Sequence, residues 1–187
     1  MGSEFERLVG IIYRRSFRYD PAKGFVLSSG ARSDIYIDVK KTVLSAEGMV
    51  TVGRVVYERI KGLGADGIGG LTLGADPIAY AAAMTSNLAG DPLEVFIVRK
   101  EAKKHGTMRW IEGNLGEGAR VVVVDDVVTT GASTIKAVEK AREAGFEVVK
   151  VLALVDRCEG GRENIERTTG CAFEAVVSRE DLLRLRP

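Results

Sequence analysis

Four consecutive valines, Val121–Val124, are followed at once by two aspartates, Asp125 and Asp126. A run of β-branched residues without polar alternation has no face for solvent, so it predicts a central parallel strand that is buried on both sides. An apolar stripe then predicts a helix over Ser133–Ala144, which Gly145 ends. A buried strand that ends in carboxylates and turns into a helix limits the chain to an α/β fold.

The turn between this strand and this helix carries several hydroxyl groups. They belong to Thr129, Thr130, Ser133 and Thr134. At a helix N-terminus the free backbone N–H groups and the helix dipole attract an anion, and Gly131 permits close approach. Asp125 and Asp126, one turn away, suit ribose hydroxyls or a divalent cation held through its waters. The segment therefore predicts a sugar-phosphate site; the alternative is a Rossmann-like strand whose aspartates only cap the next helix.

Strand and helix patterns alternate along the rest of the chain. Short apolar runs predict β segments at Phe25–Ser29, Ile35–Asp38, Asp66–Leu71, Glu94–Val98, Glu147–Asp156 and Ala172–Val177. Apolar stripes predict helices at Glu4–Arg15, Ala46–Leu63, Pro77–Ser86 and Glu163–Thr168, and Ser178 is placed to cap a last helix. This alternation predicts a parallel sheet flanked by helices on both faces. We expect the 187 residues to form one domain, 1–187.

Charge and cysteine content exclude several classes of protein. Lys and Arg number 27 against 26 Asp and Glu, so no global basic field attracts nucleic acid. Cys158 and Cys171 lack the spacing of a disulfide framework or a structural zinc site. No run approaches the roughly 18 apolar residues of a membrane span, and Met1–Arg7 is not a basic, apolar leader. We therefore expect a cytoplasmic protein that binds neither nucleic acid nor membrane.

Residues Val121–Ser133 closely resemble the phosphoribosyl pyrophosphate (PRPP) motif of the type I phosphoribosyltransferases. The resemblance implies that the two aspartates contact the ribose 2- and 3-hydroxyls and that the following loop holds the 5-phosphate. The implied PRPP-binding residues are Asp125, Asp126, Val127, Val128, Thr129, Thr130, Gly131, Ala132, Ser133 and Thr134. It also implies Mg²⁺ carried by PRPP with no direct protein ligand, Asp125 and Asp126 acting through water.

A charged run, Arg99–Gly106, opens a glycine-punctuated stretch to Gly118 without strand alternation or a helical stripe, which predicts a mobile loop. A solvated face is the alternative. Cationic groups on a closing loop neutralise the charge of departing pyrophosphate. The run resembles the catalytic loop of the orotate phosphoribosyltransferases, which reaches across a dimer interface, so it implies a homodimer with shared active sites. The implied catalytic residues are Arg99, Lys100, Lys103 and His105, with Lys103 the strongest candidate and Lys104 only solvated.

Two further segments resemble the orotate-binding parts of that family. The first is the amino-terminal turn, where many bacterial members carry Lys-Ser-Gly and this chain has Ser28-Ser29-Gly30; Lys40 and Lys41 are weak substitutes. The second is Arg157, at a carboxyl strand end where open α/β sheets place ligands. Orotate differs from uracil by a carboxylate, which arginine grips with two parallel hydrogen bonds. The implied orotate-binding residues are Ser28, Ser29, Tyr36, Thr129 and Arg157. An ordinary β-turn and a surface salt bridge are the respective alternatives.

The stretch Gly69–Pro77 resembles the family's pyrophosphate loop, because backbone N–H groups in a glycine turn before a helix suit an anion. The implied residues are Thr72, Leu73, Gly74, Ala75 and Asp76. Some relatives carry a lysine near the last two positions. This chain does not, which shifts the expected binding to backbone contacts and magnesium.

Together these segments imply the type I phosphoribosyltransferase fold: a parallel central sheet flanked by helices, a small N-terminal hood over the base, and a mobile catalytic loop. We expect about residues 1–40 and the C-terminal part to form the hood. The implied reaction transfers the phosphoribosyl group from PRPP to orotate, giving orotidine 5-monophosphate and pyrophosphate in de novo pyrimidine (UMP) synthesis. The rivals are a purine or uracil salvage transferase and a PRPP-sensing DNA-binding regulator, for which the segment before Phe25 is too short.

Overall fold

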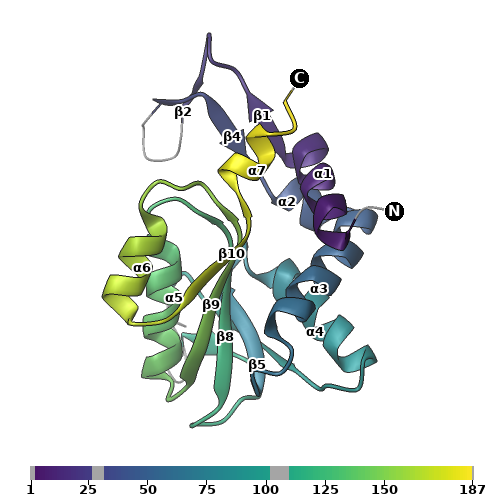
Figure 1. Cartoon of the computed structure of the whole chain (residues 1–187). Helices are drawn as coiled ribbons and strands as arrows, with labels where there is room; N and C mark the ends of the chain where they lie inside the picture. Colours follow the sequence, from purple (N-terminus) through teal and green to yellow (C-terminus); the bar gives the residue numbers. More distant parts are fainter. Residues whose placement is uncertain (1–2, 27–31, 102–109, 187) are drawn as a thin grey trace.

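The computed structural model describes residues 3–26, 32–101 and 110–186. Within them, a six-stranded sheet runs in the order β10-β9-β8-β5-β6-β7 (Figure 1). Its strands are β5 (Gly67–Leu71), β6 (Glu94–Val98), β7 (Ile111–Glu112), β8 (Arg120–Val128), β9 (Glu147–Asp156) and β10 (Phe173–Ser178). Neighbouring strands are parallel except for β7, which is antiparallel to β6. The predicted α/β fold with a parallel sheet is confirmed.

Strand β8 lies between β5 and β9, and its four valines are at most 1% exposed, as the sequence predicts. Because side chains alternate along a strand, Val122 and Val124 belong to one hydrophobic cluster, and Val121 and Val123 to the other. The first cluster contains side chains of α1 (Glu4–Ser16), α3 (Ala46–Ile60) and α4 (Asp76–Leu88). The second contains side chains of α5 (Ala132–Glu143) and α6 (Gly161–Thr169). Figure 1 shows these two helical layers on opposite faces of the sheet.

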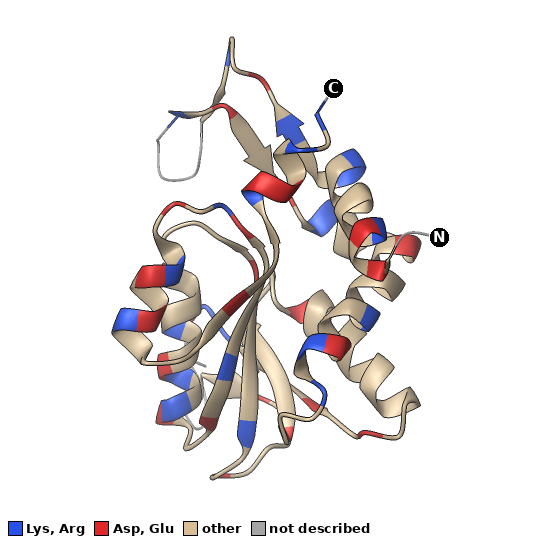
Figure 2. Ribbon diagram, in the orientation of Figure 1, with Lys and Arg blue, Asp and Glu red and all other residues tan. Residues whose placement is uncertain are grey.

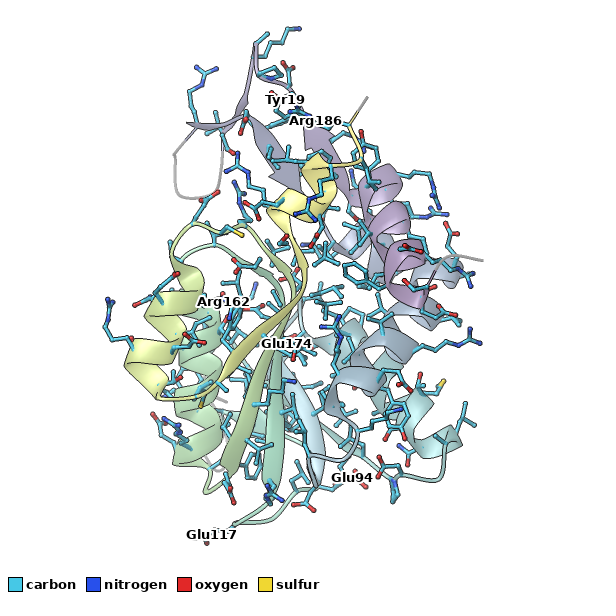
Figure 3. All side chains as sticks on the ribbon, in the orientation of Figure 1. Tyr19, Glu94, Glu117, Arg162, Glu174 and Arg186 are labelled. Atoms are coloured by element: carbon cyan, nitrogen blue, oxygen red, sulfur yellow. The ribbon has the colours of Figure 1, made fainter. Side chains whose placement is uncertain are left out.

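A smaller layer lies beyond the carboxyl ends of the central strands (Figure 1). It consists of β1 (Phe17–Tyr19), β2 (Phe25–Val26), β3 (Arg32–Ser33), β4 (Ile35–Ile37), α2 (Lys40–Val43) and α7 (Arg179–Leu183). Strand β1 pairs with β4, and β2 pairs with β3. The C-terminal segment is joined to this layer, because Arg179 lies 3.4 Å from Asp34 and the Arg186 guanidinium lies 4.0 Å from the centre of the Tyr19 ring (Figure 3).

Several short elements were not predicted from the sequence: β1, β3, α2 and β7. Strand β7 corrects the prediction that Arg99–Gly118 is loop throughout, because Ile111 and Glu112 pair with Val98 and Ile97 of β6. A two-residue edge strand is stabilised by pairing with its neighbour, and two residues are too few to show the alternation of apolar and polar side chains that predicts a strand. Helix α3 ends at Ile60, short of the predicted Leu63. No helix among the described residues has the length and apolar character needed to cross a membrane.

Candidate functional site

The two aspartates at the end of β8 point to opposite sides of the sheet. Asp125 is 5% exposed and turns toward α5, where the Thr134 hydroxyl donates to its Oδ2 at 2.6 Å. Its Oδ1 accepts the backbone N–H of Asp126 at 3.0 Å. The sequence predicted one sugar-phosphate site that both acids share, and strand alternation turns their side chains to opposite faces of the sheet.

Burial raises the pKa of Asp125 to about 6, and the negative charge of Asp126 adds to the shift. Hydrogen bonds from Thr134, the Asp126 backbone and Ser133 act in the opposite direction but do not cancel it. The folded protein therefore holds the Asp125 proton more tightly than the unfolded chain does. As a result, the free energy of unfolding falls as the pH rises through the interval between the unfolded and folded pKa values.

Asp125→Asn is expected to stabilise the fold at about pH 8. The pKa rises from 3.8 to about 6 on folding, and at about 1.4 kcal/mol per pKa unit the amide avoids a cost of about 1–3 kcal/mol. The gain should shrink toward zero as the pH falls to about 4, because the wild-type carboxyl is then neutral in the fold. Urea unfolding at several pH values measures this. Asp91→Asn, at an exposed site, is the control; a gain independent of pH would contradict the account.

Asp126 faces the opposite side, where it meets the turn after β5 and a lysine from α2. A Cβ atom on Gly74 would lie 2.5 Å from Asp126 Oδ1, so a larger residue there would displace the Asp126 carboxylate. Lys40 Nζ lies 3.6 Å from Asp126 Oδ2 and 3.2 Å from Asp38 Oδ1. Burial acts to lower the pKa of Lys40, but the two aspartates outweigh it and the pKa is raised. The sequence indicated only a weak role for Lys40, as a substitute for a missing lysine, and the spacing Asp38-x-Lys40 was the available signal of its contact with Asp38.

The hydroxyl-rich turn is built around Gly131, which has φ 81° and is the N-cap residue of α5. A Cβ atom there would lie 2.7 Å from Ile165 Cγ1, so only glycine fits the turn against α6. Asn164 of α6, which the sequence analysis missed, donates from its side-chain amide to Thr130 O at 2.8 Å. Within the part of the chain that the structure describes, no side chain caps α5. The alternative in which the aspartates only cap this helix is therefore wrong, and its N–H groups remain available for an anion.

The five residues predicted for pyrophosphate lie in the turn after β5, Thr72–Ala75, and at the first position of α4, Asp76; the Thr72–Leu73 peptide bond in this turn is cis. The Thr72 hydroxyl donates to Asp76 Oδ2 at 2.6 Å. Thr72 also lines a pocket of about 470 Å³ together with Arg99 and Lys100. The structure thus brings part of the predicted catalytic run next to the predicted pyrophosphate turn.

Arg157 directly follows β9 and is 5% exposed; it does form a salt bridge, with Glu159, but its guanidinium is buried and does not lie on the surface. Its Nε and Nη2 lie 2.9 and 2.8 Å from Glu159 Oε1, and Nη2 donates to Ser33 Oγ at 3.1 Å. Its backbone N–H donates to Val128 O at 2.9 Å, which ties it to the start of the hydroxyl-rich turn. The guanidinium therefore lies between the hydroxyl-rich turn and strand β3 of the smaller layer.

Tyr36 is partly exposed in β4, with its ring 5.7 Å from that of Phe25. Four predicted site residues lie outside the described residues: Ser28, Ser29, Lys103 and His105. Arg99 is described, and its Nη1 lies 3.1 Å from Glu112 Oε1. The site is thus assembled from the ends of β5, β8 and β9, the N-terminus of α5 and the layer above them.

Comparison with known proteins places these features in a family context. Residues 69–177 match the family model described as "Phosphoribosyl transferase domain". An orotate phosphoribosyltransferase of Aquifex aeolicus is 51% identical over 164 residues, covering 88% of this chain and 90% of the relative. One of Sorangium cellulosum is 46% identical over 188 residues, covering 99% and 96%. The crystal structure of Mycobacterium tuberculosis H37Rv orotate phosphoribosyltransferase in complex with PRPP has a TM-score of 0.77 at 32% identity, covering 97% and 93%.

Proposed function

The chain belongs to the orotate phosphoribosyltransferase family, and we propose that its reaction takes place at the carboxyl ends of β5, β8 and β9. The enzyme transfers the phosphoribosyl group of PRPP to orotate, which gives orotidine 5-monophosphate and pyrophosphate in pyrimidine synthesis. The observation that carries the site assignment is the end of β8. There an uncapped helix N-terminus and two acids lie beside a buried arginine.

The acids and the turn divide PRPP between them. Asp125 and Asp126 accept hydrogen bonds from the ribose hydroxyls, one from each side of the strand end. The turn Thr129–Thr134 binds the 5-phosphate through the free N–H groups and dipole of α5, with its hydroxyls as further donors. Asn164 supports this turn through Thr130 O. The ribose is thereby fixed with its C1 toward the base.

The leaving pyrophosphate faces the turn Thr72–Asp76 and the cations of the charged run. Backbone N–H groups of this turn, together with Arg99 and Lys100 on the same pocket, stabilise its growing charge. Lys103 and His105 are proposed to act there by their place in the run. As the C1–O bond breaks, an orotate nitrogen forms the new bond to C1, so the enzyme contributes positioning and electrostatic stabilisation.

Arg157 is proposed to recognise the orotate carboxylate, with Glu159 and Ser33 holding its guanidinium in place. Tyr36, Ser28, Ser29 and Thr129 are proposed to line the base site. The smaller layer, which contains the described part of the predicted hood segment beyond α1 together with α7, is proposed to form the hood over the base. The ion pair between Arg179 and Asp34, which joins these two segments, supports this division.

Mg²⁺ is proposed to enter with PRPP. Two groups could accept hydrogen bonds from the waters that surround such an ion. One is the partly exposed carboxylate of Asp126, and the other is Asp76 Oδ1, which is buried without a hydrogen-bond partner among the described residues. Asp125 is proposed to act in the same way. When bound, the ion neutralises charge on the pyrophosphate. A cytoplasmic location remains a proposal, and the free thiols of Cys158 and Cys171 are consistent with it.

A homodimer is proposed from an apolar surface on α3 and α4, which Figure 2 shows with few charges on α4. Its large side chains are 45–85% exposed. They are Met49, Val50, Tyr80, Met84 and Leu88. Several of them line a groove of about 460 Å³ between the helices. Contiguous exposed apolar surface of this kind is typical of an interface between protein subunits.

Met84→Glu is expected to convert the dimer into monomers and to lower orotate turnover at least about tenfold, because a buried carboxylate at a two-fold interface is costly and the sites are shared. Light scattering with parallel activity assays measures both effects. Leu185→Glu, at an exposed site on the C-terminal segment, is the matched control. A monomeric wild type, or a Met84→Glu dimer with full activity, would overturn the proposed interface.

Initial rates of pyrophosphate release separate the proposed activity from its rivals. Orotate should support turnover, whereas uracil, adenine, hypoxanthine and guanine should give at most traces. Turnover with a purine and none with orotate would reject the assignment. Binding of PRPP without any turnover would favour a sensor instead.

A further inference from the structure

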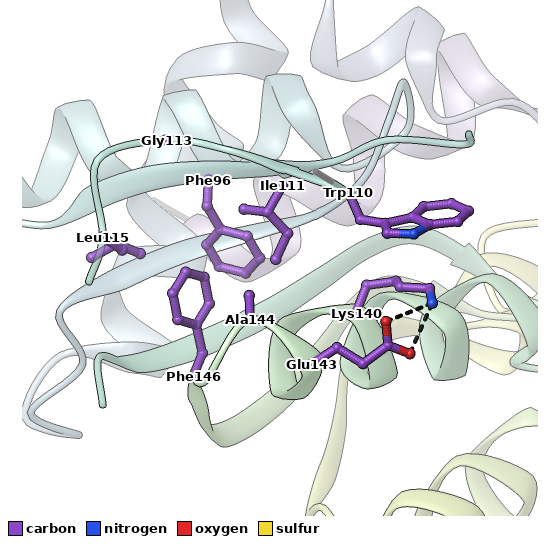
Figure 4. A pocket seen from close by; sticks show the side chains of 9 residues that line it. All are labelled: Phe96, Trp110, Ile111, Gly113, Leu115, Lys140, Glu143, Ala144 and Phe146. Atoms are coloured by element: carbon purple, nitrogen blue, oxygen red, sulfur yellow. Dashed lines mark hydrogen bonds and ion pairs between the residues drawn. The ribbon is translucent and has the colours of Figure 1, made fainter. Parts of the chain in front are cut away.

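Trp110, the only tryptophan of the chain, lies against two lysines of α5. The ammonium groups of Lys136 and Lys140 lie 4.9 and 4.5 Å from the centre of its ring. Figure 4 shows the indole above the Lys140 side chain. Cations at this distance are attracted by the negative face of the ring. Lys140 also forms an ion pair with Glu143 at 2.7 Å.

Lys136 makes a second contact, on the other side of the charged run. Its Nζ donates to the backbone oxygen of Lys100 at 2.9 Å. The segment that ends at Lys100 and the segment that begins at Trp110 also contact each other directly, because Arg99 N donates to Trp110 O at 2.8 Å. Residues 102–109 lie outside the described residues. One lysine thus contacts both described stems that flank them.

A pocket lies beside Trp110 and leaves part of the indole without packing contacts. It has a volume of about 480 Å³, and Figure 4 shows its lining. The aromatic pair Phe96 and Phe146, with ring centres 5.6 Å apart, packs at a distance from the indole in this view. An indole next to open space is held less by core packing than one that is enclosed. Its contacts with Lys136 and Lys140 therefore carry more of its placement.

Helix α5 begins at the turn proposed to bind the 5-phosphate. Lys136 follows Ala132, the first residue of α5, by four positions, which is about 6 Å along the helix. We propose that Lys136 and Lys140 are positioning residues, which hold the stems at Lys100 and Trp110 against α5 and so place Arg99 and Lys100 beside Thr72. This inference rests on the proposed pyrophosphate site. Neither lysine is proposed to contact the substrate.

Lys136→Met is expected to raise the KM for PRPP about tenfold, because it loses a charge-assisted hydrogen bond as well as the contact with the ring. Lys140→Met loses the ring contact and the ion pair with Glu143 but leaves the contact of Lys136 with Lys100 intact, so it should raise this KM only about threefold. The KM for orotate should change less than twofold in both variants. Lys136→Arg, which keeps the charge and a donor, should recover most of the loss. Lys61→Met, an exposed lysine paired with Glu58, is the control and should match the wild type.

The fluorescence of Trp110 reports on its contacts with Lys136 and Lys140, here called the lysine clamp, and this readout does not depend on turnover. Because Trp110 is the only tryptophan, a change in its emission in Lys136→Met and Lys140→Met, but not in Lys61→Met, reports the loss of the contact. PRPP should also change the emission of the wild type. A Lys136→Met variant that folds but keeps the wild-type KM for PRPP would overturn the inference. Trp110 emission in Lys136→Met and Lys140→Met that equals the wild-type emission would also overturn it. A wild type that leaves PRPP and orotate unreacted contradicts the proposed function instead, and the emission of the variants still tests the clamp.

Discussion

Lys103→Ala is expected to lower kcat with orotate by about a hundred- to a thousandfold while the Kd of PRPP changes less than about threefold. Removal of one preorganised donor to a developing oxyanion costs about this much in rate. The ground-state complex keeps the phosphate turn, the ribose acids and the backbone of the Thr72 turn, so its affinity should persist. Steady-state kinetics and direct titration with PRPP measure the two quantities separately.

Lys104→Ala is the matched control, because it removes the neighbouring ammonium group from the same charged run. It should behave like the wild type. Equal losses in both variants would show that the run acts only through its overall charge. A Lys103→Ala enzyme with near wild-type turnover would reject the catalytic assignment of the run.

Arg157→Met is expected to lower kcat/KM for orotate by about a hundred- to a thousandfold. The variant loses the donors to the orotate carboxylate and leaves Glu159 without its buried cation, and truncation of one member of a buried charge pair costs about 2–5 kcal/mol. The trace turnover expected with uracil, which lacks the carboxylate, should not fall with it. Competition between orotate and uracil for PRPP measures the change in preference.

The double variant Arg157→Met/Glu159→Gln separates recognition from folding. Arg157→Met alone should also lower the thermal stability, because the Glu159 carboxylate is left unpaired. The double variant removes that carboxylate, so its thermal stability should return toward the wild-type value while orotate turnover stays low. Arg184→Met, at an exposed arginine of the C-terminal segment, should affect neither property. Recovery of orotate turnover in the double variant would contradict a direct role for Arg157.

The sequence predicted those elements that have a clear hydrophobic pattern of their own. Val121–Val124 has no polar alternation, and it forms a strand buried on both sides. The bounds Glu94–Val98 and Glu147–Asp156 agree with the structure. By contrast, β1, β3 and β7 have only two or three residues and are held by their partner strands, so their own sequence carries little signal.

The site shows the same division. The residues of the hydroxyl-rich turn, Gly131 among them, are contiguous in the chain, so the sequence alone was enough to propose an anion site there. The contact of Lys40 with Asp126 and that of Arg157 with Ser33 join residues far apart in the chain, and only the fold brings them together. The separation of Asp125 from Asp126 was accessible from strand alternation, and it was overlooked because the two acids were taken as one unit.

Product analysis tests the central claim most directly. The protein is incubated with orotate, PRPP and Mg²⁺, and the products are separated and identified by mass. The account predicts orotidine 5-monophosphate and pyrophosphate in equal amounts, with neither formed when orotate is omitted. Pyrophosphate without orotidine 5-monophosphate, or a nucleotide formed only from uracil or a purine, would contradict it.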